Sequence, residues 1–77
     1  MSNRLSNWTF RDIELFLKRN GFKLNYTNAS HYYYIGYKKG ILRNVCVPFH
    51  GQKSIKPRTF KGIILQSGIE AKKWFND

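Results

Sequence analysis

The sequence predicts an α+β domain in which a helix, three antiparallel strands and a second helix follow one another, with a short helical tail. Apolar residues recur at helical spacing before residue 21, alternate with polar ones up to residue 49, and return to helical spacing from residue 57. Turn-forming residues separate these blocks. We therefore expect a single domain over residues 1–77, with a three-stranded antiparallel sheet packed on two helices.

The first helix is expected to begin after Thr9. The Thr9 hydroxyl can accept from the backbone N–H of Asp12, and the Asp12 carboxylate can reach back to the N–H of Thr9, which is a reciprocal capping arrangement. Gly21 should end the helix because glycine readily adopts the left-handed conformation at a C-cap. The apolar face between them consists of Ile13, Phe16 and Leu17.

Three strands are expected between the two helices. In the first, Phe22, Leu24 and Tyr26 alternate with polar residues up to a polar turn at 27–29. The second, over 31–37, is rich in aromatic residues. The third strand covers 41–49 and carries the alternating apolar residues Val45, Val47 and Phe49.

The turn between the second and third strands decides what lies near His31. If residues 39 and 40 form a two-residue turn, His31 lies opposite Pro48, and His50 is its diagonal neighbour, about 7–8 Å away on the same face. A loop that is one residue longer would place His50 on the other face. The sequence leaves both registers open.

The second helix is expected to begin at Pro57, after a loop over 50–56, and to end at Gly68. Residues 69–75 then add a short helical tail. The apolar residues expected to pack these elements, together with Trp8, are Phe60, Ile63, Ile64, Trp74 and Phe75.

The strongest compositional feature is positive charge, because fourteen Lys and Arg oppose four Asp and Glu and give a net charge of +10. Such an excess favours an anionic partner, with nucleic acid first. A membrane surface is less favoured because no basic amphipathic helix stands out, and no apolar run is long enough to span a bilayer. A single cysteine and the absence of a secretory signal favour the cytoplasm.

Part of this positive charge is concentrated around the start of the second helix. A helix N-terminus offers free backbone N–H groups and the positive end of its dipole, so basic residues there can form a phosphate site. The alternative is a solvated basic face. The residues concerned are Lys53, Lys56, Arg58 and Lys61, and the hairpin turn adds Lys38 and Lys39 as further candidates for phosphate contacts.

Several short motifs, in their order and spacing, resemble the HicA toxins of bacterial toxin–antitoxin pairs. Ala29-Ser30-His31 is similar to the family's Gly-Ser-His at a strand start, and residues 47–51 read Val-Pro-Phe-His-Gly, similar to its Val-Pro-x-His-Gly. Residues 56–59, Lys-Pro-Arg-Thr, match its Lys-Pro-x-Thr helix start. The resemblance covers residues 9–70 and leaves residues 1–8 as an N-terminal extension.

The resemblance implies a double-stranded-RNA-binding-like fold and a metal-independent endoribonuclease, an mRNA interferase, that is inhibited by a cognate HicB-like antitoxin. It implies that His31 is the catalytic residue. No metal ion or other cofactor is expected, because two histidines with few nearby carboxylates make a poor metal site. The family's glycine is replaced by Ala29, which would be strained if that position requires a positive φ.

The chemistry of RNA cleavage suits a histidine. The RNA supplies its own nucleophile, the 2′-OH, so the enzyme must remove that proton, protonate the leaving 5′-oxygen and stabilise charge on the phosphate. An ordinary imidazole titrates near pH 6.5 and can serve in either proton role. His50 is a candidate second proton carrier, or it positions the loop. Ser30 orients the phosphate or His31, or is a simple turn residue.

Two alternatives to a ribonuclease remain. One is a non-catalytic RNA-binding module of the same fold, and the other is a protein-interaction module for an acidic partner. The tyrosines of the second strand are expected mainly to hold the sheet, although those on the face away from the helices could stack bases. The RNA sequence preference and the oligomeric state are not encoded in any pattern that we can read.

Overall fold

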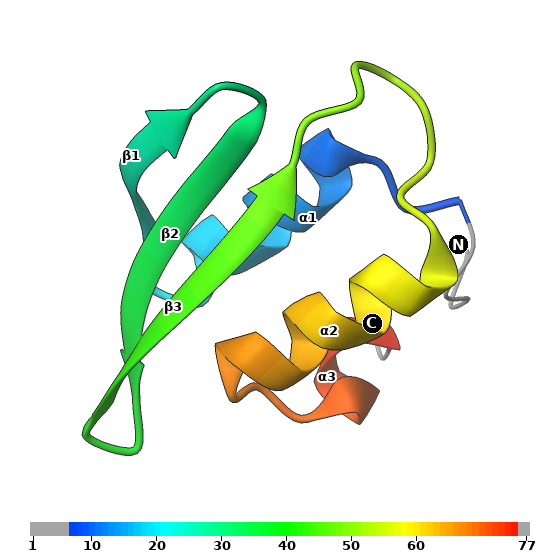
Figure 1. The fold of residues 1–77 in the computed structure, drawn as a ribbon. Helices are drawn as coiled ribbons and strands as arrows, with labels where there is room; N and C mark the ends of the chain where they lie inside the picture. Colours follow the sequence, from blue (N-terminus) through cyan, green and yellow to red (C-terminus); the bar gives the residue numbers. More distant parts are fainter. Residues whose placement is uncertain (1–6, 76–77) are drawn as a thin grey trace.

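The computed structural model describes residues 7–75. Its three strands form one antiparallel sheet in the order β1-β2-β3, and its helices all lie on the same side of that sheet (Figure 1). The predicted α+β class and element order are confirmed. Residues 1–6 of the predicted N-terminal extension lie outside the described residues. In chain order the elements are α1 Phe10–Arg19, β1 Lys23–Asn28, β2 His31–Lys38, β3 Ile41–Pro48, α2 Pro57–Ser67 and α3 Ala71–Phe75.

The capping arrangement predicted for α1 is present. The backbone N–H of Asp12 donates to Thr9 Oγ1 at 3.3 Å, and the N–H of Thr9 donates to Asp12 Oδ2 at 3.0 Å. Gly21 adopts φ +88° just beyond the helix, and the N–H of Phe22 then donates to the carbonyl of Leu17 at 3.0 Å. These bonds satisfy backbone groups at both ends of α1 and direct the chain into β1.

The first strand differs from the sequence-based expectation. β1 continues to Asn28, so the turn consists of Ala29 and Ser30 and not of residues 27–29. The pairing of β1 with β2 shifts between Leu24 and Tyr26, which places these two side chains on opposite faces of the sheet, and both are exposed, at 42% and 52%. The predicted strand is present, but all six residues of β1 are exposed. β1 is an edge strand of the sheet, and a bulge of this kind increases its local twist.

The turn between β2 and β3 follows the two-residue prediction. Lys39 and Gly40 both have positive φ, +54° and +78°, as a two-residue hairpin turn between twisted strands requires. The register runs from Lys38 opposite Ile41 at the turn to His31 opposite Pro48 at the other end. The register in which the strands pair through a two-residue turn is therefore confirmed.

The core lies between the sheet and the helices. From the sheet, Tyr34, Val45 and Val47 are completely buried against residues of the helices. A group of stacked and edge-on aromatic rings joins α1, α2 and α3, with Phe16 and Trp74 stacked at 4.0 Å. The expected packing roles of Trp8, Phe60, Trp74 and Phe75 are confirmed by their ring contacts.

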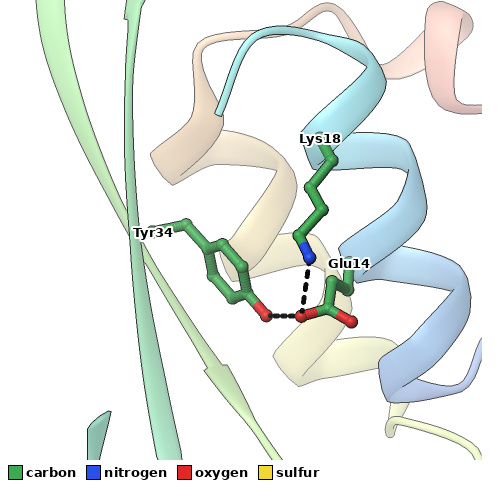
Figure 2. A network of polar contacts seen from close by, with 3 residues as sticks. All are labelled: Glu14, Lys18 and Tyr34. Carbon is green, nitrogen blue, oxygen red and sulfur yellow. Dashed lines mark hydrogen bonds and ion pairs between the residues drawn. The ribbon is translucent and has the colours of Figure 1, made fainter. Parts of the chain in front are cut away.

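One polar network connects α1 to the centre of the sheet. The Tyr34 hydroxyl donates to Glu14 Oε2 at 2.6 Å, and Lys18 Nζ lies 3.7 Å from the same oxygen (Figure 2). Burial, together with the hydrogen bond to Glu14, raises the pKa of Tyr34 above its ordinary value of 10. This network fixes the strand that begins with His31 against α1.

Candidate functional site

His31 is the first residue of β2 and its side chain is exposed. Tyr32 and Tyr34 belong to the core side of the sheet, where Tyr32 packs against the core and Tyr34 is buried. Because side chains alternate along a strand, His31 and Tyr33 point to the opposite face. We call this face, which no described helix covers, the outer face (Figure 1). By register it carries Lys23, Tyr26, Asn28, His31, Tyr33, Ile35, Tyr37, Leu42, Asn44, Cys46 and Pro48.

The turn before His31 contains the departure from the family motif. Ala29 adopts φ +55°, a left-handed conformation that favours glycine. The carbonyl of the next residue, Ser30, accepts from the N–H of Phe49 at 2.8 Å. This bond extends the pairing of the two segments by one residue beyond His31 and Pro48, so the start of β2 and the end of β3 are held together where the candidate residues lie.

His50 follows directly and is exposed at the start of the β3–α2 loop. Its carbonyl accepts from the N–H of Lys53 at 3.2 Å, which closes a turn. Farther along, Ile55 is buried and its N–H donates to the carbonyl of Trp8 at 2.7 Å. Hydrogen bonds thus hold the loop near both of its ends, and His50 lies two residues after Pro48, the residue paired with His31. We call the region that contains His31, Pro48 and His50 the histidine end of the sheet.

The loop leads from the histidine end of the sheet to the start of α2 (Figure 1). Four predicted phosphate ligands occur along this path, and all four side chains are exposed: Lys53, Lys56, Arg58 and Lys61. Lys56 is the N-cap residue and makes no side-chain cap, and the first turn of α2 contains no acidic residue. The free backbone N–H groups and the positive end of the helix dipole therefore add to the charge of these side chains.

The structure separates Lys38 and Lys39 from the other candidates. Both residues lie at the turn of the β2–β3 hairpin, at the opposite end of β2 from His31. Lys38 follows His31 by seven residues. At about 3.4 Å per residue, that is roughly 24 Å along the strand. A single phosphate at His31 would therefore be beyond the reach of this turn, and only an extended chain could contact both.

A groove of about 680 Å³ lies between the start of α1 and the loop that carries His50. Arg11 and Gln52, which sequence reasoning did not select, supply polar side chains to it, as does Glu14. No local motif indicates this groove, because its walls come from segments about forty residues apart. The other residues that line the groove are Thr9, Phe10, Phe49 and Gly51.

Within residues 7–75, no cluster of three or more His, Cys, Asp or Glu side chains is placed to hold a metal ion. Over the same residues, no helix has the length and apolar character needed to cross a membrane.

The family model described as HicA toxin of bacterial toxin–antitoxin matches residues 10–69, well over half of the chain. The chain belongs to the HicA toxin family. The match includes His31, His50 and every basic residue selected from the sequence. No curated protein and no solved structure matches significantly.

Membership of the HicA family establishes the broad role of the chain as the toxin of a toxin–antitoxin system, which implies a cognate antitoxin. Toxins of the HicA family are mRNA interferases.

Proposed function

We propose that this HicA-family chain is a metal-independent endoribonuclease that cleaves mRNA with His31 as a proton carrier. The observation that carries the proposal is the exposed side chain of His31 at the first position of β2. The adjoining turn is bonded to Phe49, and the loop that follows leads into the basic start of α2. A proton-transfer group, positive charge and open access therefore occur together.

In the proposed reaction, the 2′-oxygen of the substrate attacks the adjacent phosphorus as its proton is removed. The bond between phosphorus and the 5′-oxygen breaks, and that oxygen takes up a proton. His31 carries one of these protons. His50 carries the other or positions the loop, while Ser30 orients His31 or the phosphate. Lys53, Lys56, Arg58 and Lys61 balance the negative charge that develops on the phosphate oxygens.

The decisive test is replacement of His31 by Ala or Gln. The side chain is exposed, so the fold should be retained, and loss of acid–base catalysis should reduce the cleavage rate by about 10²–10⁴-fold. RNA binding should remain nearly unchanged. A single deoxynucleotide at the cut site should stop cleavage by removing the nucleophile.

His50→Ala is the matched comparison, because His50 is also exposed and lies at the same end of the sheet. A loss as large as that of His31→Ala identifies a second proton carrier, and a smaller loss identifies a positioning role. A folded His31→Ala chain that cleaves RNA at the normal rate would refute the catalytic role and favour a non-catalytic RNA-binding module of the same fold.

The antitoxin implied by the family is proposed to be a HicB-like acidic protein that covers His31 and residues 53–58. Covering both would block the substrate and neutralise charge in one contact. Hydrogen exchange of the complex measures which amides it protects. Protection at residues 29–33 and 53–58 supports this contact, whereas protection confined to α1 contradicts it.

A further inference from the structure

The outer face of the sheet presents aromatic side chains to solvent. Tyr37 is 69% exposed and Tyr26 is 52% exposed, although tyrosine rings bury substantial area when they have a partner. No described helix covers this face (Figure 1). The exposed rings lie on the two strands that flank the turn before His31, so they belong to the same surface as the candidate catalytic residue.

Two of these rings form an ordered pair. Tyr26 and Tyr33 are cross-strand neighbours, and their ring centroids are 4.5 Å apart with an interplanar angle of 7°. Parallel stacking of this kind presents aromatic faces in a fixed orientation. Tyr33 follows His31 by two residues, which is about 7 Å along the strand. A nucleotide next to a phosphate at His31 would therefore have its base at the level of this pair.

The distribution of charge on the sheet indicates which class of ligand the outer face would bind. Residues 23–48 include no Asp or Glu, whereas the three acidic residues among residues 7–75 occur on α1 or just before α3. Lys23 lies on the outer face by register, and Lys39 occupies the turn at its far end. A surface with aromatic rings, cations and no carboxylates favours a polyanion whose units have flat apolar faces, which is the chemistry of single-stranded nucleic acid.

We infer that the outer face binds the single-stranded part of the RNA substrate, with bases stacked on the Tyr26–Tyr33 pair and on Tyr37 and the backbone extending from His31 toward Lys39. This inference rests on the proposed function and names its substrate class. It gives Lys38 and Lys39 a role in binding phosphates of the extended strand, although they are too far from His31 to contact a phosphate there. A paired duplex would not fit this mode, because its bases are already stacked on each other.

The first test separates aromatic stacking from other contacts by paired substitutions. Tyr26→Leu with Tyr33→Leu removes the π faces and keeps apolar bulk, whereas Tyr26→Phe with Tyr33→Phe keeps the π faces and removes the hydroxyls. Affinity for a labelled eight-nucleotide single strand is measured by fluorescence anisotropy in a His31→Gln background, which prevents cleavage. The leucine pair should weaken binding about ten-fold or more, and the phenylalanine pair about two-fold or less.

Two controls define what the change means. Leu65→Ala removes an exposed apolar side chain from α2 and should leave affinity unchanged. A blunt RNA duplex should bind the leucine pair and the parent equally. Unchanged single-strand affinity of a folded leucine pair overturns the inference. A similar loss in the phenylalanine pair also overturns it, because recognition would then depend on the hydroxyls.

A second measurement needs no substitution on the face. The methyl groups of Ile35 lie on the outer face, and those of Ile63 are buried in the core. Addition of the single strand should shift the Ile35 methyl resonances in the NMR spectrum and leave those of Ile63 in place. Shifts confined to the core or to the groove beside α1 would overturn the inference even if the leucine pair failed to fold.

The same variants distinguish other occupants and keep the two proposals separate. If the leucine pair loses only self-association, or only binding to an acidic protein, the face is not an RNA surface. If it binds RNA normally while His31→Gln abolishes cleavage, the catalytic proposal stands and this inference fails. If it weakens binding while His31→Gln still cleaves RNA, this inference stands and the catalytic proposal fails.

Discussion

At the scale of single residues, Ala29 illustrates how a motif can be kept while one of its members is strained. Its φ of +55° places a Cβ in a region that costs an L-residue roughly 1–2 kcal/mol. The conformation persists because the flanking residues are fixed by pairing, with Asn28 opposite His31 and Ser30 bonded to Phe49. The strain expected from the sequence is therefore present, and the turn before His31 keeps a two-residue form.

Ala29→Gly should stabilise the protein by about 0.5–1 kcal/mol. Glycine removes the strain at positive φ, and part of the gain is offset by the greater freedom of glycine in the unfolded chain. Urea unfolding followed by circular dichroism measures the change. Gly36→Ala is the opposite control, because its Cβ would lie 2.7 Å from the Phe22 ring and should destabilise the fold. A destabilised Ala29→Gly chain would show that the alanine conformation is not strained.

At the scale of elements, the contact of α1 with β2 depends on a hydrogen bond between a buried hydroxyl and a carboxylate (Figure 2). Tyr34 is completely buried and Glu14 is partly exposed, with a side-chain exposure of 20%. Such bonds contribute more than neutral ones, and loss of the hydroxyl leaves the Glu14 carboxylate with only the distant Lys18 ammonium.

Tyr34→Phe should therefore lower the free energy of unfolding by about 1–2 kcal/mol near pH 7. The pKa of Tyr34 is raised in the folded state, so its stabilising contribution is fully present below pH 10, the ordinary value, and is lost as pH rises above it. The difference between the parent and Tyr34→Phe should shrink above pH 10, as measured by urea unfolding across pH. A difference that stayed constant would mean that Tyr34 ionises equally in both states.

The β3–α2 loop, which carries His50, is also held in place by buried contacts and hydrogen bonds. Its charged residues are exposed, yet Ile55 is buried and bonded to the carbonyl of Trp8. A loop fixed in this way would hold His50 and its neighbours in a defined position before the proposed RNA substrate binds. Groups that are already fixed lose less conformational entropy when a ligand binds. This preorganisation is typical of an active site and is not needed for nonspecific electrostatic binding.

At the scale of the whole molecule, the net charge of +10 on 77 residues should make the proposed RNA binding dependent on salt. If about three phosphates are neutralised, the log–log slope of affinity against salt is roughly −2 for single strands. Raising salt from about 50 to 200 mM should then weaken binding on the order of 20-fold. Titration at several salt concentrations measures the slope, and a flat response would contradict a role for the basic surface.

The distribution of that charge matters as much as its amount. The sheet contains no carboxylate, and two separate basic groups occur at its ends, near the start of α2 and at the β2–β3 turn. The field of the molecule can thus guide a long anion along the outer face as well as toward the histidine end. The salt slope should fall when Lys39 is replaced by Ala if the RNA reaches that turn.

Much of this molecule follows from local rules that act within a few residues. The capping residues of α1 and the two-residue turn before Ile41 determined their elements, because backbone bonding and positive φ are local requirements. The turn also fixed the pairing of His31 with Pro48. The end of β1 was predicted wrongly, because the polar residues Thr27 and Asn28 are typical of a turn but pair with Tyr32 and His31.

Only the tertiary structure decided which side chains of each strand face the helices and which face solvent. Alternation alone could not tell whether Tyr33 or Tyr34 is buried, because either set could meet the helices, and the choice depends on which side the helices occupy. The groove beside α1 and the stacked Tyr26–Tyr33 pair also join segments that are distant in sequence or offset by a bulge. The sequence by itself determined the order of elements, the charge and the motif residues, whereas packing determined that the face shared by His31, Tyr33 and Tyr37 is the one that the described helices leave uncovered.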